Sequence, residues 1–344
     1  MDSHASYLQK RHFGSLDGLR AISITAVIWH HTAPKWSGAI LGYIGTYGVH
    51  LFFAISGFLI TTLLLRERSR KGSIDLTAFY LRRTLRIFPL YFGVLAIYIV
   101  LVAFLEQGVL VRKEFFNNLI YFATYTSNLF VKLDGRVIFY FAWSLATEEQ
   151  FYLIWPSILS KTETPSRAVT LLTVVLMVCI SDQLLGTGFL SAIPVAIVGG
   201  ALLATALHTE RGFDLLKLFL GQRWSIFALI LALVLLIVLW PPPEFIIHLL
   251  FVLIVGASVI RENHPLRVLF SCKPVRYIGS ISYGMYMFHM LCEHIIVKML
   301  EFLRWDAIGI EVFVLTFLLS VVVARLSFTY FESFFLNVKH KFER

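Results

Sequence analysis

The sequence predicts an all-α integral membrane protein, a bundle of about ten transmembrane helices within a single transmembrane domain over residues 1–344. Apolar residues make up 58% of the chain and charged residues only 15%, a balance outside the range of soluble globular domains. Apolar runs long enough to cross a bilayer recur along almost the whole sequence. Lys and Arg lie at the ends of these runs and form no solvated basic stripe, which excludes a nucleic-acid-binding protein.

Ten apolar runs have spanning length, at about 20 residues for each crossing. They cover residues 17–33, 40–65, 84–105, 137–160, 167–184, 189–208, 224–240, 244–260, 279–300 and 308–331. The first run follows a basic start but lacks a small-residue cleavage site, which favours a retained span over a removed signal peptide. An eleventh run, 115–131, is interrupted by three Asn and several hydroxyl residues. We expect it to be a re-entrant or interfacial segment on the outer side.

The placement of basic residues predicts the orientation of the chain. With ten crossings, twenty-two Lys and Arg fall on the side of the N-terminus and six on the other side. If 115–131 also crossed, the basic loops after residue 160 would lie outside, against the positive-inside rule. We therefore predict that both termini are cytoplasmic.

The first span carries two ionisable residues on one face. Arg20 and His31 are eleven residues apart, so they lie within about 20° of each other around the helix and roughly 16 Å apart along it. Such groups cost several kcal/mol in hydrocarbon unless they face a cavity or the bundle interior. This face is a candidate functional site, although Arg20 could be an orientation anchor and His31 an interfacial residue. His30 points about 100° away and is expected to be structural.

The segment before the third span contains Arg82, Arg83 and Arg86, which a helix brings together at its cytosolic end. Guanidinium groups match phosphate oxygens well, so this cluster is a candidate phosphate site. The alternative is a patch for anionic lipid headgroups.

The fourth span contains two adjacent carboxyl groups, Glu148 and Glu149, where at most one can share a cavity with Arg20 and His31. Ser56-Gly57 in the second span predicts close packing of helices and no catalytic role for Ser56. His289 and Glu293 lie four residues apart and could pair within a helix, with a structural or a functional histidine equally expected.

Five blocks in this order, GLRAISITAVIWHH, YGVHLFFAISGFLIT, FYLRRTLRIFPLY, WSLATEEQFYLIWP and IGSISYGMYMFH, resemble the acyltransferase 3 family of membrane O-acyltransferases. That family includes O-antigen, exopolysaccharide, nodulation-factor and macrolide acylases. The resemblance implies transfer of an acyl group from cytosolic acyl-CoA to a hydroxyl of a carbohydrate or glycan-type acceptor at the bacterial inner membrane. We expect the acyl group to be acetyl, and the donor therefore to be acetyl-CoA. Some relatives carry an SGNH hydrolase-like domain after the membrane region; we expect none in a chain ending at Arg344.

The resemblance also implies roles for single residues. It makes Arg20 and His31 necessary for activity and places Arg82, Arg83 and Arg86 near the phosphates of the donor. Glu148 matches the family's first Glu of the fourth block. Where family members often read Ser-Val-Glu, this chain has Ala146-Thr147-Glu148, so a hydroxyl role at position 146 is not retained, whereas Ser144 is.

These expectations combine into a mechanism. His31 acts as general base on the acceptor hydroxyl, and Glu148 orients its imidazole; a covalent acyl-histidine relay is the alternative. We assign substrate binding to Ser144, Tyr152, Tyr283 and His289. Acyl-CoA is the co-substrate and membrane lipid a partner. No metal is expected, because Cys179, Cys272 and Cys292 lack metal-ligand spacing.

The acceptor is expected to bind the outer segment 106–136, including Tyr121, Tyr125 and Asp134, whose aromatic and polar mixture suits a sugar; packing at an interface is the alternative. A different class of function, a proton-coupled transporter of a small solute, would also use His and Glu residues within the membrane. The chain shows no inverted repeat, and a transporter gives the arginine cluster no purpose.

Overall fold

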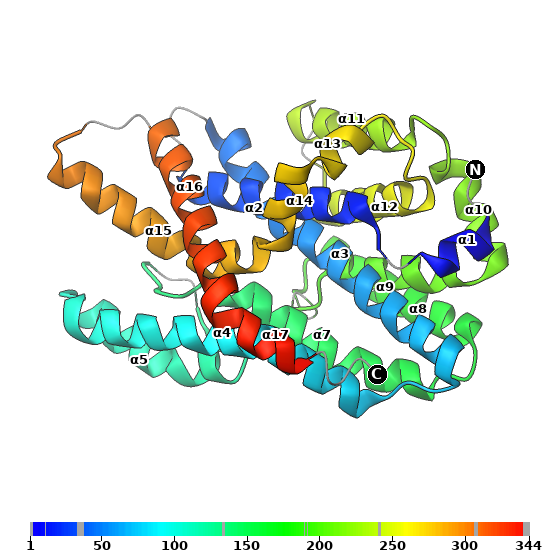
Figure 1. Ribbon diagram of the computed structural model, residues 1–344, viewed down its shortest axis with the longest axis horizontal. Helices are drawn as coiled ribbons and strands as arrows, with labels where there is room; N and C mark the ends of the chain where they lie inside the picture. The colour runs from blue at the N-terminus through cyan, green and yellow to red at the C-terminus, as the bar shows by residue number, and fades with distance from the viewer. Residues whose placement is uncertain are drawn as a thin grey trace.

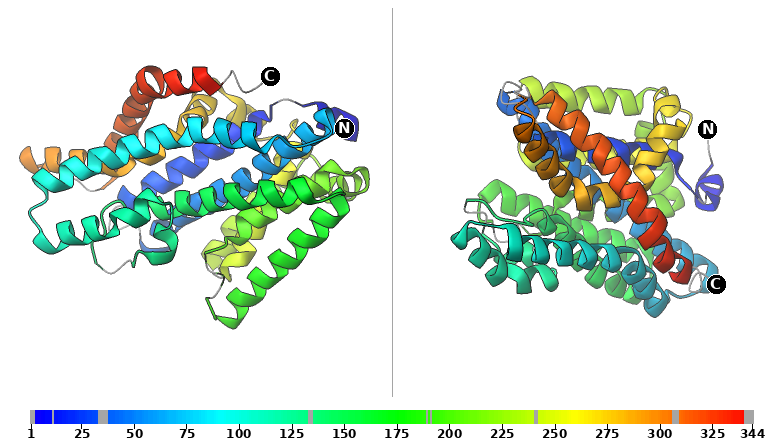
Figure 2. Two further views of the ribbon diagram at one scale, coloured as in Figure 1. Left: turned by 90° about the horizontal axis from the view of Figure 1, so that it is seen from below. Right: turned by 60° about the vertical axis from the view of Figure 1, so that its left-hand side comes forward.

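The computed structural model describes residues 3–10, 12–32, 38–132, 135–188, 190, 192–239, 242–305 and 309–339. Within these residues the chain consists of helices and turns, with no strand, and this confirms the all-α prediction. Most of the longer helices lie lengthwise in the molecule, and the orange-red helix near the C-terminus crosses them at a steep angle (Figures 1 and 2).

Each of the ten predicted apolar runs overlaps one helix of 14 to 34 residues. These helices are α2 (Gly14–Thr32), α3 (Gly38–Lys71), α4 (Leu76–Leu105), α7 (Ala142–Lys161), α8 (Pro165–Leu185), α9 (Val195–His208), α11 (Ser225–Leu239), α12 (Glu244–Ile260), α15 (Ser282–Phe302) and α16 (Ile310–Ser327). Further helices connect or flank them: α1 (His4–Gln9), α5 (Val109–Ala123), α6 (Ser127–Phe130), α10 (Glu210–Leu220), α13 (Arg267–Ser271), α14 (Lys273–Ser280), the π-helix η2 (Phe328–Glu332) and α17 (Ser333–Lys339).

Four helices in the described part of the chain are long and apolar enough to cross a membrane: Gly45–Lys71, Leu76–Leu105, Pro165–Leu185 and Ile310–Val338. The α10 and α11 pair, bent by 66°, is a fifth candidate. These spans make the chain an integral membrane protein, while the count of ten crossings stays a prediction. Helices α2, α7 and α15 have 19, 20 and 21 residues, so length does not exclude them. They are less apolar because they carry the candidate site residues.

Helices α3 and α9 pack unusually close together, as the Ser56-Gly57 pair predicted. A Cβ atom at Gly57 would lie 2.0 Å from the carbonyl oxygen of Ile197, and one at Gly200 would lie 2.2 Å from that of Ala54. Glycine at both positions therefore lets the two backbones touch. This contact fixes the position of α3, and with it Ser56.

The interrupted run 115–131 forms the second half of α5, a turn and α6. Tyr125 lies in this turn with a φ of 53°, and its buried ring stacks on Tyr91 of α4 at a centroid distance of 4.3 Å. Tyr121 stacks on Phe130 at 5.2 Å. Both tyrosine rings therefore pack against neighbouring aromatic rings, as in the packing alternative that the sequence left open beside acceptor binding. Asp134 lies outside the described residues.

Both ends of the described chain lie on the side of the bundle where α3 ends and α4 begins (Figures 1 and 2). The Arg66 guanidinium of α3 donates hydrogen bonds to the carbonyl oxygens of Lys10 and Tyr7, which ties the N-terminal segment to this side. The two ends thus share one side of the molecule, and its cytoplasmic orientation remains a prediction.

Candidate active site

An open cavity of about 100 Å³ lies among α2, α3, α4, α7 and α15, and we call it the inner cavity. Side chains from all five helices line it, so residues far apart in the sequence meet there. Seven of the ten predicted site residues are among them: Arg20, Arg83, Arg86, Ser144, Glu148, Tyr152 and Tyr283. The sequence placed the arginine cluster at the cytosolic end of its helix and Glu148 within a span, and it could not show that they share one cavity.

Glu148 is held by hydrogen bonds to both of its carboxyl oxygens. Ser56 donates to Oε1 at 2.9 Å, and the Tyr152 hydroxyl, one helical turn along α7, donates to Oε2 at 3.0 Å. The Arg83 guanidinium lies over the Tyr152 ring, 4.9 Å from its centroid. Arg20 and Arg83 line the same cavity as the carboxyl group. Glu148 is therefore fixed in orientation among cationic side chains.

The inner cavity adjoins two larger hollows on the side where α3 ends and α4 begins. One, of about 450 Å³, is lined by Arg82, Arg83 and Arg86 together with further basic residues of α3, namely Arg66, Arg70 and Lys71. The other, of about 440 Å³, includes Arg20, Arg66, Arg86, Tyr283 and Glu332. Arg86 lines both hollows and the inner cavity. We call the first hollow the cationic vestibule.

The arginines of the cationic vestibule are not equivalent. Arg82 forms an ion pair with Glu67 of α3 at 3.2 Å, whereas Arg83 and Arg86 also line the inner cavity. Glu67 lines the vestibule as well. The predicted trio therefore lies together, with two of its members also facing the inner cavity.

His31 lies beyond the inner cavity, further along α2. Its ring nitrogens are 3.0 Å (Nδ1) and 3.2 Å (Nε2) from the Tyr140 hydroxyl, and its ring centroid is 5.0 Å from that of His289. His289 donates from Nδ1 to the carbonyl oxygen of Tyr286 at 2.6 Å. The Tyr286 hydroxyl, 2.6 Å from Ser144 Oγ, belongs to the wall of the inner cavity. His31 is thus joined to that cavity through two intervening residues.

This arrangement corrects the expected pairing of Glu148 with His31. The carboxyl group is directed to Ser56 and Tyr152, and the imidazole to Tyr140. The reason is depth: Glu148 shares a cavity with Arg20, and His31 lies roughly 16 Å further along the same helix than Arg20. The possible pair of His289 with Glu293 is also not formed among the described residues. Instead, His289 Nδ1 donates to a backbone carbonyl oxygen of the same helix.

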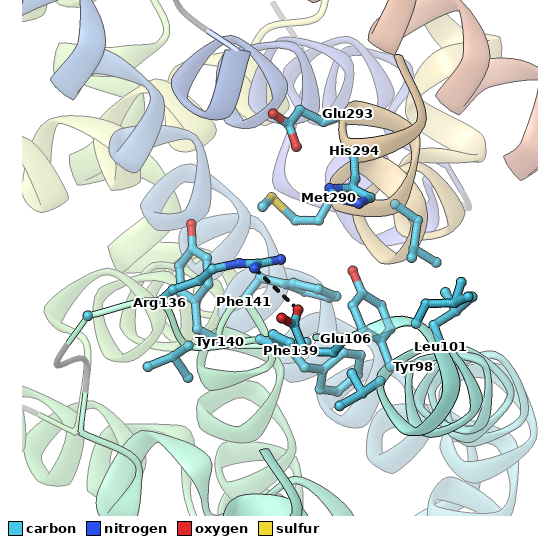
Figure 3. Close-up of a pocket in the computed structure, with 16 residues that line it drawn as sticks. Tyr98, Leu101, Glu106, Arg136, Phe139, Tyr140, Phe141, Met290, Glu293 and His294 are labelled. Carbon is cyan, nitrogen blue, oxygen red and sulfur yellow. Dashed lines mark ion pairs between the residues drawn. The ribbon is translucent and has the colours of Figure 1, made fainter. Parts of the chain in front are cut away.

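A second cavity, of about 470 Å³, lies between α4, α15 and residues 135–141, and we call it the outer cavity (Figure 3). Glu106 and Arg136 form an ion pair of 3.2 Å across one wall, and Glu293 and His294 of α15 face them from the opposite wall. Tyr140 lines this cavity and also contacts His31. His31 is therefore positioned between the two cavities.

Sequence reasoning missed three residues of this arrangement, Ser56, Tyr140 and Tyr286. Ser56 was assigned to packing alone, although a hydroxyl within a span needs a partner. Tyr286 could have been found, since it lies three residues from both Tyr283 and His289 on one helix. Tyr140 could not, because its contact joins positions 109 apart in the chain. Among the described residues, no three His, Cys, Asp or Glu side chains are grouped as metal ligands would be.

The fold and the site define an integral membrane protein with a carboxyl-containing cavity that adjoins a cation-lined vestibule. A family model described as an acyltransferase domain matches residues 13–327. The chain therefore belongs to this acyltransferase family, the one that its sequence blocks resemble.

The relatives that the chain matches are named as O-acetyltransferases. The chain is 30% identical to the peptidoglycan O-acetyltransferase OatA of Listeria monocytogenes, over 94% of this chain and 56% of that protein. It is 26% identical to a putative O-acetyltransferase of Staphylococcus aureus (95% and 58%) and to the putative peptidoglycan O-acetyltransferase YrhL of Bacillus subtilis (94% and 54%). The chain thus spans a little over half the length of these relatives. No solved structure matches it.

Proposed function

We propose that this protein transfers an acyl group from cytosolic acyl-CoA to a hydroxyl of a glycan-type acceptor at the bacterial inner membrane, and that the acyl group is acetyl. The observation that carries the proposal is the convergence of Arg20, Arg83, Arg86 and Glu148 on one cavity that adjoins a cationic vestibule. The O-acetyltransferase names of the relatives support a glycan acceptor. Residues 1–344 act as one transmembrane domain with ten spans and both termini cytoplasmic.

The donor binds across the vestibule and the inner cavity. Arg82, Arg83 and Arg86 hold the phosphates of CoA, since guanidinium groups form paired, charge-assisted hydrogen bonds with phosphate oxygens. The vestibule, at about 450 Å³, has the size of a small-molecule site. The inner cavity, at about 100 Å³, is too small for a nucleotide. Only the slim pantetheine arm enters it, lined by Ser144, Tyr152 and Tyr283.

His31 performs the acyl transfer at the far end of this arm. Its neutral imidazole takes the proton of the acceptor hydroxyl, the oxygen attacks the thioester carbonyl, and the carbon–sulfur bond breaks as CoA leaves and accepts that proton. His289 positions the His31 ring by packing against it in a tilted arrangement. Glu148, fixed by Ser56 and Tyr152, holds Arg20 and the donor arm in place. Family membership and the basic vestibule favour this chemistry over proton-coupled transport.

The proposal is tested by incubating the purified protein with acetyl-CoA and cell-envelope glycan and measuring free CoA by chromatography. We expect wild-type protein to release CoA, and His31→Ala to abolish release while acetyl-CoA still raises its unfolding temperature. Arg83→Ala should raise the half-saturating acetyl-CoA concentration about tenfold, as expected for one lost charge-assisted contact. Arg325→Ala, at an exposed position on α16, is the matched control and should behave as wild type.

Two results would contradict the proposal. One is turnover by His31→Ala at the wild-type rate, and the other is wild-type protein that binds acetyl-CoA but never releases CoA. Mass spectrometry of the rapidly quenched protein separates direct transfer from the covalent alternative. An acetyl group on His31 would assign the relay mechanism.

A further inference from the structure

The outer cavity has its own set of lining residues. Among the described residues, none of those that line it also lines the inner cavity or the vestibule. Its connection to the candidate chemistry is Tyr140, whose hydroxyl lies within hydrogen-bonding distance of His31. A ligand in the outer cavity would therefore approach His31 from the side opposite to the donor.

The outer cavity and the vestibule lie at opposite ends of α4. Arg86 is in the third turn of this helix, and Glu106 is its C-cap residue. Their separation of about twenty positions corresponds to about 30 Å of helix, which is the thickness of the hydrocarbon core of a bilayer. A donor that binds from the cytosol would thus leave the outer cavity open to the opposite face of the membrane.

Two polar groups of the outer cavity have unused hydrogen-bonding capacity. In the part of the chain that the structure describes, neither the Tyr98 hydroxyl nor the Glu293 carboxyl group has a hydrogen-bond partner, although both line the cavity. Glu106, by contrast, is engaged by Arg136 and by the backbone N–H of Gly108 at 2.9 Å. A carboxylate accepts hydrogen bonds at two oxygens. Glu293 is therefore suited to a ligand that offers several hydroxyl donors.

The remaining wall of the outer cavity is apolar and includes aromatic rings. Tyr98 and Phe139 lie 5.0 Å apart between ring centroids, and Phe139 and Phe141 lie 4.8 Å apart. Apolar ring surface next to a few convergent polar groups is the composition of a site for an amphipathic small molecule. Two carboxyl groups against the single guanidinium of Arg136 disfavour an anionic ligand. A neutral pyranose, with C–H faces and a rim of hydroxyls, has both required features.

We propose that the outer cavity binds the acceptor as a neutral pyranose unit, with Glu293 accepting hydrogen bonds from its hydroxyls and the aromatic wall packing against the ring. This inference rests on the proposed function and adds to it the location and class of the acceptor. Tyr140, which lines the outer cavity and contacts His31, connects the bound sugar with that histidine.

The test blocks the outer cavity without touching the donor site. Met290→Cys places a thiol in the cavity wall, and Lys298→Cys, on an exposed position of the same helix, is the control. Intact cells that depend on each variant are treated with a membrane-impermeant thiosulfonate, and base-released acetate of the envelope glycan is measured. We expect newly formed O-acetate to fall about tenfold or more for modified Met290→Cys, and to remain unchanged for modified Lys298→Cys and treated wild type.

A second variant keeps the cavity open and removes one charge. Glu293→Gln should lower glycan O-acetate about tenfold, the effect of a lost hydrogen bond to a charged group, whereas Glu301→Gln on the same helix should leave it unchanged. Purified Glu293→Gln should retain the acetyl-CoA-dependent rise in unfolding temperature. Loss of that rise would assign Glu293 to the fold and overturn the inference.

The two proposals fail in different ways. If wild-type cells form no O-acetylated glycan, the proposed function is wrong. If wild-type cells form it, and blocked Met290→Cys and Glu293→Gln form it equally well, only the acceptor site is wrong.

Discussion

Substituting Gly57 by alanine tests whether the α3–α9 contact is as close as described. The new Cβ atom would lie 2.0 Å from the Ile197 carbonyl oxygen and 2.9 Å from its carbon. Because these are backbone atoms, no side-chain rotation relieves the overlap, and the helices must separate by about 1.5 Å to restore an ordinary contact. Overpacking of this kind costs about 3 kcal/mol. The better helix propensity of alanine returns about 1 kcal/mol, so we expect a net loss of about 2 kcal/mol.

The same displacement should reach the candidate active site. Ser56 precedes Gly57 on α3 and donates to Glu148 at 2.9 Å. A separation of about 1.5 Å would break that hydrogen bond, since such bonds weaken well before 4 Å. We therefore expect Gly57→Ala to lose acyl-transfer activity together with stability. Ser56→Ala removes the hydrogen bond without the steric overlap and should lower activity alone.

Thermal unfolding of the purified protein in detergent measures the stability change. Gly93→Ala on α4 is the matched control, because its new Cβ would lie 3.5 Å from Phe331 Cζ, an ordinary contact. We expect Gly93→Ala to unfold at or above the wild-type temperature and Gly57→Ala clearly below it. Equal unfolding temperatures for the two variants would refute the described packing.

Two further predictions concern single hydrogen bonds, and a third concerns a titrating histidine. Tyr152→Phe removes the donor to Glu148 at 3.0 Å but keeps the ring under Arg83, so the acyl-transfer rate at a fixed acetyl-CoA concentration should fall about tenfold; a wild-type rate would contradict this. Trp155→Phe leaves the fully buried Thr61 hydroxyl without its 2.8 Å partner and should cost about 1–3 kcal/mol of unfolding free energy. Burial and a nearby arginine lower the pKa of His264, in the loop after α12. The unfolded chain then binds more protons as pH falls below about 6.5, so His264→Gln should reduce the stability lost on acidification in thermal unfolding.

Much of the architecture follows from the sequence alone. Each apolar run became a helix because apolar length and flanking basic residues are local properties. The guanidinium cluster was predictable for the same reason, since Arg82, Arg83 and Arg86 lie within two turns of one helix. Faces and depths within α2 were likewise set by helix geometry, which placed His31 further into the membrane than Arg20.

The relative depth of different helices could not be predicted. Glu148 was assigned to His31 because both are polar groups in apolar spans, but tertiary packing sets the register of α7 against α2 and places Glu148 beside Arg20. Tyr140 follows a segment without helical periodicity, so nothing local points to its contact with His31. The eleventh run was ambiguous because its Asn and Tyr residues suit packing and ligand binding equally well.

The central claim is that an acyl group enters from the vestibule and leaves at the opposite face of the membrane. Sealed vesicles of known orientation test it directly when acetyl-CoA with a radiolabelled acetyl group is supplied to one face and labelled glycan is measured on the other. We predict labelled glycan when the face carrying Arg83 and Arg86 meets acetyl-CoA, and none when only the face of the outer cavity does. Equal labelling from both faces, or labelling from the outer face alone, would contradict the account.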